Sequence, residues 1–219
     1  MHRLLEQHWT SQGVLQHICQ HLAEQTVQLS SLSIEDQVIT HMLWQHCNQM
    51  PVTVATIDTG RLPQQTYDVI AQTEQKLGMS VKVFFPDSND VEKLMATSGV
   101  NGFYNSLLDR QDCCYVRKVK PLTRILKSYD IWITGLRRAH MPERDQVSLI
   151  EWDEARNMVK VNPLYDWDEQ QVWQYIDQHD MPYNQLYQQG YQSIGCAPCT
   201  RAIKSGEPIR AGRWGWEVP

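Results

Sequence analysis

Apolar stretches of two kinds alternate along the first 135 residues. Short runs rich in apolar and β-branched residues predict four strands, at 27–30, 52–59, 81–85 and 131–135. Apolar residues that recur every three or four positions predict helices over 34–43, 63–76 and 121–127. Strands that alternate with helices predict an α/β fold, a mostly parallel twisted sheet with helices on both faces.

The N-terminal stretch differs from this alternation. Residues 3–24 carry an imperfect helical stripe of apolar residues that breaks near Gly13. We therefore divide the chain into an N-terminal helical segment, residues 1–25, and a single α/β domain, residues 26–219. The first nine residues have no continuous apolar core, so we do not expect a secretory signal.

The C-terminal part also departs from it. Apolar runs at 147–152 and 158–161 flank a turn and predict an antiparallel pair of strands. Acidic residues at 166–169 open a short helix that reaches Ile176, where the helix dipole favours negative charge. Residues 190–219 are irregular and rich in glycine and proline, so something besides an apolar core must order them.

Composition and charge narrow the class of protein. The 219 residues are 42% hydrophobic and 21% charged, which is ordinary for a globular protein. A formal net charge of −5 argues against a general nucleic-acid binder. No apolar run approaches the roughly 18 residues of a membrane-spanning helix. We therefore expect a cytoplasmic protein with no membrane or nucleic-acid partner.

Six cysteines carry the most specific signal. Two tight pairs stand out, Cys113-Cys114 and Cys196-Ala-Pro-Cys199, and in a reducing compartment such pairs indicate a metal or redox centre. Four thiolates suit zinc or an iron–sulfur cluster. Adjacent cysteines favour a [4Fe–4S] cluster over one tetrahedral ion, while four unrelated buried thiols remain the alternative. The other two, Cys19 and Cys47, lie at helical spacing beside apolar residues and are expected to be buried free thiols.

Polar residues follow two of the predicted strands. Ser30, Ser31 and Ser33 lie between a strand and a helix, where hydroxyls and free backbone N–H groups can bind an anion. An ordinary helix cap at Ser33 is the alternative, and the stretch lacks the Gly-rich Walker pattern. The turn Asp58-Thr59-Gly60-Arg61 lies where ligands bind an open α/β sheet.

Arginines and lysines gather in the sequence around and between the cysteine pairs. Arginine forks bind phosphate and sulfate through paired hydrogen bonds, although most surface cations only aid solubility. Two of the arginines flank Ala211-Gly212, where backbone and guanidinium can both approach an oxyanion. The full set is Arg117, Lys118, Arg137, Arg138, Arg144, Arg201, Lys204, Arg210 and Arg213.

These motifs, in this order, resemble the assimilatory adenylyl-sulfate (APS) reductases, relatives of the PAPS reductases. The resemblance begins near residue 26 and covers nearly all of the remaining chain. Its most specific element is the double cysteine pair, which the PAPS-specific branch lacks. The matching stretches are SSLSIEDQVITH at 30–41, TIDTGRLPQQTY at 56–67, GVNGFYNSLLDRQDCCYVRKVKPLTRIL at 99–126, WITGLRR at 132–138, VNPLYDWDEQQVW at 161–173 and SIGCAPCTRAIKSGEPIRAGRW at 193–214.

The resemblance implies an adenine-nucleotide hydrolase-like α/β fold and a role for each matching residue. The four paired cysteines would hold a [4Fe–4S] cluster, and Ser30, Ser31 and Ser33 would line a phosphate loop. The phosphosulfate would be bound by Lys118, Arg144, Arg210 and Arg213, with Lys118 between cluster and substrate. Asp58, Gly60 and Arg61 would lie near the adenosine. A thioredoxin or glutaredoxin-type thiol would be the reductant, and the resemblance leaves a homo-oligomer open.

One family feature is missing from this sequence. The family's nucleophile is a cysteine in a C-terminal Glu-Cys-Gly-Leu/Ile-His segment, and the printed chain ends at Pro219 without it. We therefore expect no catalytic nucleophile within the chain, and APS binding with little or no reduction. The alternatives are a PAPS reductase, a non-catalytic iron–sulfur or nucleotide-binding paralogue, and a zinc-stabilised ATP-using enzyme of the same fold.

Overall fold

The computed structural model of the chain describes residues 4–5, 8–47, 52–140 and 147–217. The chain divides into two units that interleave along the sequence. The first unit contains residues 1–56, 66–82 and 126–184, and the second contains residues 57–65, 83–125 and 185–219. The predicted N-terminal segment, residues 1–25, thus falls within the first unit.

One sheet of six strands organises the fold, in the order β3-β2-β1-β4-β6-β5. β1 pairs in parallel with β2 and with β4, and β4 pairs in parallel with β6. β5 runs antiparallel to β6, as the turn between 152 and 158 predicts. The α/β prediction is therefore confirmed. The strands are β1 (Thr26–Leu29), β2 (Thr53–Ile57), β3 (Lys82–Phe84), β4 (Ile131–Ile133), β5 (Ile150–Asp153) and β6 (Met158–Val161).

The central strands are buried because helices cover the sheet. Val27, Ile131 and Ile133 have no exposed surface, as expected for parallel strands with both faces covered. Gln28 of β1 is equally buried, and its amide donates to the carbonyl oxygen of Asp36 at 2.8 Å. This hydrogen bond fixes the helix that follows β1 against the strand and so positions the intervening loop.

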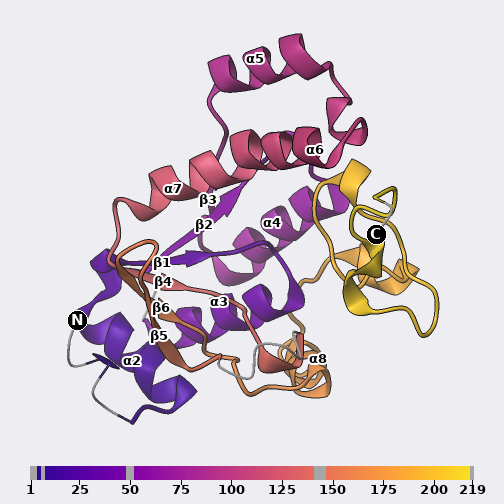
Figure 1. The fold of residues 1–219 in the computed structure, drawn as a ribbon. Helices are drawn as coiled ribbons and strands as arrows, with labels where there is room; N and C mark the ends of the chain where they lie inside the picture. Colours follow the sequence, from indigo (N-terminus) through magenta and orange to yellow (C-terminus); the bar gives the residue numbers. More distant parts are fainter. Residues whose placement is uncertain (1–3, 6–7, 48–51, 141–146, 218–219) are drawn as a thin grey trace. The chain divides into compact units, whose positions relative to one another are not determined.

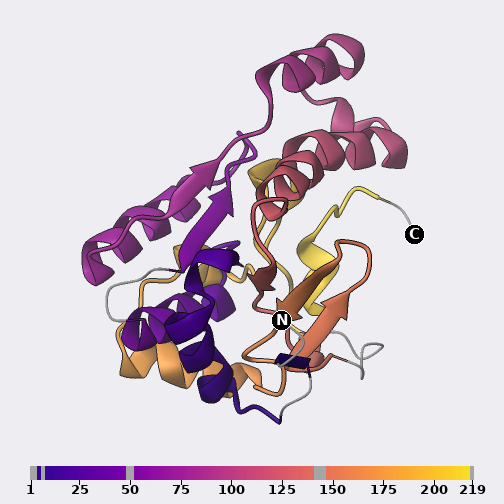
Figure 2. The ribbon, with the colours of Figure 1, turned by 90° about the vertical axis from the view of Figure 1, so that its left-hand side faces the viewer.

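The first unit also contains the helices that pack around its strands. Figure 2 shows α2 and α3, in indigo, beside the orange α8. The predicted break near Gly13 lies a few residues earlier, because residues 8–10 are not helical and α2 begins after Thr10, whose Oγ1 accepts the Gly13 N–H at 3.0 Å. The helical elements are α2 (Ser11–His21), η1 (Ala23–Gln25), α3 (Ile34–His46), most of α4 (Gln64–Leu77), η4 (Arg138–His140) and α8 (Glu169–Gln178).

The second unit contains helices that the apolar pattern did not predict. Neither α5 nor α6 has a fully buried residue, so neither carries the apolar stripe by which a helix is recognised. Figure 1 shows α6 and α7 as one long run of helix, which a π-helical turn connects. Its elements are α5 (Ser88–Ser98), η2 (Gly102–Tyr104), α6 (Leu107–Cys114), the π turn η3 (Tyr115–Val119), α7 (Lys120–Leu126), η5 (Gln185–Gln189), η6 (Ala197–Cys199) and η7 (Ile209–Gly212).

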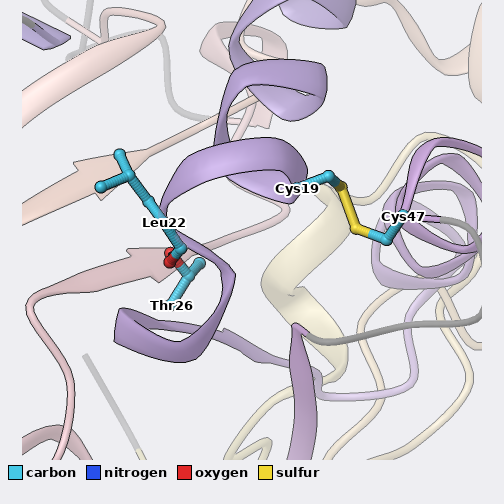
Figure 3. Close-up of a disulfide and its surroundings, with 4 residues drawn as sticks. All are labelled: Cys19, Leu22, Thr26 and Cys47. Atoms are coloured by element: carbon cyan, nitrogen blue, oxygen red, sulfur yellow. A yellow bond between two sulfur atoms is a disulfide. The ribbon is translucent and has the colours of Figure 1, made fainter.

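The prediction of free thiols at Cys19 and Cys47 is wrong. The two cysteines form a disulfide that joins α2 to the C-terminal cap of α3 (Figure 3). Their Cα atoms lie 4.9 Å apart, inside the range that a disulfide spans. A reducing compartment favours free thiols, and neither cysteine by itself indicates a partner in the sequence. The packing of α2 against α3 brings the two sulfur atoms together.

A buried histidine predicts how stability depends on pH. The pKa of His41 is lowered from 6.5 to about 4, mainly by burial and further by His179 and Lys76. His41 is 5% exposed, and its Nδ1 lies 2.9 Å from the hydroxyl of Tyr175. The unfolded chain therefore binds an extra proton between pH 6.5 and 4, so the free energy of unfolding falls as the pH falls through that window, by roughly 2–3 kcal/mol.

Urea unfolding of the wild-type chain and His41→Gln, compared at pH 7, 5.5 and 4.5, checks this expectation. Other groups titrate equally in both proteins, so the difference between the two curves isolates His41. The wild type should lose more stability than the variant on acidification. Parallel curves would show that His41 is not the group responsible.

Candidate functional site

The serines of the loop after β1 donate hydrogen bonds to a nearby carboxylate, that of Asp36. Asp36 is 4% exposed, and its Oδ2 accepts the Ser31 N–H at 2.6 Å, the Ser31 hydroxyl at 2.7 Å and the Ser33 hydroxyl at 3.2 Å. The Ser33 Oγ in turn accepts the Asp36 N–H and caps α3, as the sequence allowed. Ser30 is buried, and its Oγ accepts the N–H of Leu32.

Asp36 therefore accepts hydrogen bonds from the same serine groups that the sequence analysis assigned to a bound anion. Burial raises the pKa of Asp36, and the hydrogen bonds from Ser31 oppose that rise. The hydroxyls of Ser31 and Ser33 are engaged within the loop, in agreement with the alternative of an ordinary helix cap at Ser33. The signal was the spacing of Asp36 three residues after the cap at Ser33.

The loop after β4 packs directly on the β1 loop. A Cβ on Gly135 would lie 2.8 Å from Glu35 Cβ and 3.0 Å from Asp36 Oδ1, so only glycine fits there. β1 and β4 are neighbours at the point where the strand order reverses direction, which is where open α/β sheets bind ligands. The loops after β1 and β4 therefore lie together at the edge of the sheet where a ligand is expected to bind.

Arg137 in this second loop is a buried structural cation. It is 1% exposed, and its Nε and Nη2 donate to Glu35 Oε1 at 3.0 and 2.7 Å. Its Nη1 donates to the carbonyl oxygen of Trp167. Sequence reasoning grouped Arg137 with the cations near the cysteines, whereas the fold pairs it with Glu35 in the first unit.

In the second unit, the turn after β2 is fixed by its own polar groups. Asp58 is 7% exposed, and its Oδ1 accepts the Gly60 N–H at 2.7 Å. Gly60 has φ +73°, a conformation that glycine adopts without strain. The guanidinium of Arg61 lies 4.9 Å from the Phe103 ring and donates to the carbonyl oxygen of Val100. Their predicted proximity to adenosine stays a prediction.

All four paired cysteines lie in this same unit as free thiols. Cys113 and Cys114 end α6, and Cys196 and Cys199 flank η6. Burial raises the pKa of Cys113, and raises that of Cys199 to about 12. The charges of Cys196, Cys114 and Cys113 each raise the pKa of Cys199 further, which places the two pairs in one electrostatic neighbourhood.

The spacing of these thiols bears on what they can hold. Within the described ranges, no group of three or more His, Cys, Asp or Glu side chains is arranged to bind a single metal ion. Two buried N–H donors without a hydrogen-bond partner, Arg117 Nε and Trp214 Nε1, belong to residues linked to the cysteines. The Trp214 N–H of the backbone donates to the carbonyl oxygen of Cys199, and the charge of Arg117 lowers the pKa of Cys113.

The predicted oxyanion-binding cations fall into different environments. Lys118 is exposed, and Arg144 lies outside the described residues. Arg213 is held inside the unit: its Nε donates to the Cys199 carbonyl oxygen at 3.3 Å, and its guanidinium lies 5.1 Å from the Trp214 ring. Burial lowers the pKa of Arg213, and the charge of Arg210 lowers it further. Arg210 lies 5.5 Å from the same ring, so these two predicted arginines share one aromatic neighbour.

Comparison with known proteins assigns the class. The phosphoadenosine phosphosulfate reductase domain family matches residues 25–202 of this chain. The match spans both strand-end loops and both cysteine pairs. This chain belongs to that family, and the resemblance found in the sequence is confirmed. None of the helices among the described residues is both long and apolar enough to cross a membrane.

Several named proteins are similar to this chain. The adenosine 5′-phosphosulfate reductase of Agrobacterium fabrum is 46% identical over 196 residues, which cover 90% of this chain and 75% of that protein. The protein of the same name from Allochromatium vinosum is 43% identical over 206 residues, or 94% and 79% of the two chains.

Solved structures agree with the fold. The phosphoadenylyl-sulfate reductase of Candida auris, solved as a phosphate complex, superposes with a TM-score of 0.73 at 25% identity and covers 91% of this chain and 92% of its own. The FMN adenylyltransferase of Candida glabrata, at 15% identity and a TM-score of 0.58 over 94% of this chain and 71% of its own, shares the fold alone.

Proposed function

We propose that this chain binds adenosine 5′-phosphosulfate and serves its reduction to sulfite and AMP in sulfate assimilation. The observation that carries the proposal is the similarity, at 46% and 43% identity over most of the chain, to relatives named for that reaction. The free cysteine pairs of the second unit support the same assignment, because they are the family element most specific to APS.

The cysteines suit a [4Fe–4S] cluster better than one zinc ion. Four thiols without disulfides supply the donor set, and the adjacent cysteines Cys113 and Cys114 suit a larger cluster better than one tetrahedral ion. The unpartnered N–H groups of Arg117 and Trp214 suit a group that accepts hydrogen bonds through sulfur. We propose that Cys113, Cys114, Cys196 and Cys199 hold the cluster. When bound, it would supply a fixed negative charge beside the oxyanion-binding cations rather than the two electrons of the reaction.

Groups that suit an anion are present in each unit taken by itself. In the first unit, the loop of Ser30, Ser31 and Ser33 leads into the start of α3, where the helix dipole favours a phosphate. In the second unit, Arg213 and Arg210 offer guanidinium forks, and the exposed Lys118 adds a mobile charge. Arg144 completes the proposed cations, and Asp58, Gly60 and Arg61 are proposed beside the adenosine.

The proposed chemistry is a transfer to a thiol. A thiolate attacks the sulfur of the sulfate group, the bond from that sulfur to the phosphate oxygen breaks, and AMP leaves with the electron pair. A dithiol donor such as thioredoxin in the cytoplasm then reduces the resulting S-sulfocysteine, releasing sulfite while the donor becomes a disulfide. None of the six cysteines here is proposed as the nucleophile, because two form a disulfide and four are assigned to the cluster.

PAPS is the second candidate substrate. The family name and the similar Candida auris structure both refer to PAPS. A pocket for PAPS needs a further cation for the 3′-phosphate, whereas the named relatives at higher identity refer to APS. Titration of the chain with each nucleotide decides between them. We expect APS to bind about tenfold more tightly or better, and equal or tighter binding of PAPS would favour the second candidate.

Metal analysis tests the cofactor. Protein purified without oxygen should contain about four irons and four acid-labile sulfides per chain. Cys113→Ser and Cys196→Ser should lose nearly all of this iron, because serine oxygen replaces a thiolate ligand. Cys19→Ser is the matched control, since its sulfur belongs to the disulfide, and it should keep the iron. Zinc alone in the wild type, or iron retained by both quartet variants, would overturn the assignment.

A further inference from the structure

Arg117 is a buried cation in the second unit that the sequence places among the candidate oxyanion-binding cations but that the family resemblance does not assign to the substrate. It lies in the π turn directly after the first cysteine pair and is 7% exposed, whereas the neighbouring Lys118 is exposed. Within the described residues no carboxylate forms an ion pair with Arg117, and its Nε has no hydrogen-bond partner. A buried guanidinium needs a compensating anion.

Two acidic side chains lie near Arg117. Arg117 and Cys113 both line one pocket beside α5, so the guanidinium and the thiol share one side of the helix. The acidic groups that line this pocket with Arg117 are therefore the Cys113 thiol and the Asp109 carboxylate.

Arg117 also connects the two cysteine pairs. Its Nη1 donates to the carbonyl oxygen of Thr59 at 2.8 Å, and the Thr59 Oγ1 lies 3.1 Å from the sulfur of Cys196. The next residue, Gly60, leaves the guanidinium room, since a Cβ there would lie 3.3 Å from Nη1. One side chain therefore runs from the helix that carries Cys113 to the turn that contacts Cys196.

We propose that Arg117 is a positioning residue that holds the two cysteine pairs in register and supplies the fixed positive charge beside their sulfurs. The hydrogen bond from Nη1 to the Thr59 carbonyl oxygen sets the geometry, and the Nε of the same guanidinium has no hydrogen-bond partner. The part of this inference that concerns an iron–sulfur cluster rests on the proposed function. The part that concerns the register of the thiols holds in the metal-free chain.

The metal-free chain tests the register. Dibromobimane links two thiols only when they are close, and peptide mapping shows which thiols it has joined. We expect links within each pair and between the pairs in the wild type. Arg117→Met should lose most of the links between pairs, while those within Cys113-Cys114 persist as an internal standard. Arg124→Met is the matched control, because Arg124 likewise donates to a backbone carbonyl, that of Phe85, from an exposed position.

The loaded chain tests the charge. Arg117→Met should lower iron content about tenfold or more, or leave a cluster whose reduction potential is more negative, because a positive charge beside an anionic cluster eases its reduction. Arg117→Lys should restore the potential, since it restores the charge, although it lacks the fork that reaches Thr59. A merely structural role would not move the potential in this way.

The outcomes separate the two proposals. Iron-free wild-type protein that still shows Arg117-dependent links between the pairs would overturn the cofactor and keep the positioning role. Unchanged links in Arg117→Met would overturn the positioning role whatever the iron content. Loss of links in both Arg117→Met and Arg124→Met, with a lowered melting temperature in both, would show general unfolding and would also overturn it.

Discussion

Glu35→Gln is expected to destabilise the chain by about 3–5 kcal/mol, because it leaves the Arg137 guanidinium buried without its counter-charge. Both side chains are almost fully buried, and two nitrogens of Arg137 donate to one carboxylate oxygen. Arg137→Met should be costly for the converse reason, since it removes the guanidinium that donates two hydrogen bonds to the buried Glu35 carboxylate.

A double-mutant cycle in urea measures the coupling between the two residues. The combined variant, Glu35→Gln with Arg137→Met, should lose roughly 2–3 kcal/mol less than the sum of the single losses, because it no longer contains a buried unpaired charge. Asp180→Asn is the control. This substitution breaks the ion pair between Asp180 and Lys76 in the same unit. Because the Asp180 carboxylate is fully exposed, the free energy of unfolding should hardly change. Additive losses in the cycle would contradict the interpretation of this pair as a closed buried unit.

The elements that the sequence predicts well are those that carry a local signal. β1 and β4 are short and buried on both faces, so their apolar runs stand out, and the antiparallel pair is marked by a turn between two such runs. The cap at Ser33 is visible because a cap depends on residues three positions apart. Each cysteine pair is also visible in a short stretch of sequence. That the two pairs lie in the same unit is implied by the family resemblance and not by their spacing.

The features that the sequence does not predict depend on contacts between distant positions. The disulfide joins cysteines 28 residues apart, and no property of either cysteine distinguishes it from a buried free thiol. Arg137 and Glu35 are 102 positions apart, so a reader of the sequence sees two surface charges where the fold makes a buried pair. The position of Arg117 is fixed by a hydrogen bond to the carbonyl oxygen of Thr59, which lies 58 positions away in the sequence. α5 and α6 were missed for a different reason, because they bury too little to show a stripe.

Gly195→Ala is expected to weaken APS binding about tenfold or more without unfolding the protein. A Cβ at this position would overlap the Arg213 guanidinium, with Cζ and Nη1 each 2.6 Å away. The overlapped atoms are the end of a flexible side chain, so the guanidinium moves away while the backbone stays in place. If Arg213 binds the phosphosulfate as proposed, its displacement removes a charged hydrogen bond of about 1.5–3 kcal/mol.

Calorimetric titration with APS, for Gly195→Ala, Arg213→Ala and the two combined, distinguishes this mechanism from general damage. The two single variants should lose similar affinity, and the combined variant should lose little more than Arg213→Ala alone, since both act through one guanidinium. Melting temperatures should stay close to the wild type because no buried apolar contact changes. Losses that add in the combined variant, or an unchanged affinity in Gly195→Ala, would show that Gly195 does not act by leaving room for Arg213. We therefore predict that the glycine before the second cysteine pair contributes to substrate binding by leaving room for the Arg213 guanidinium.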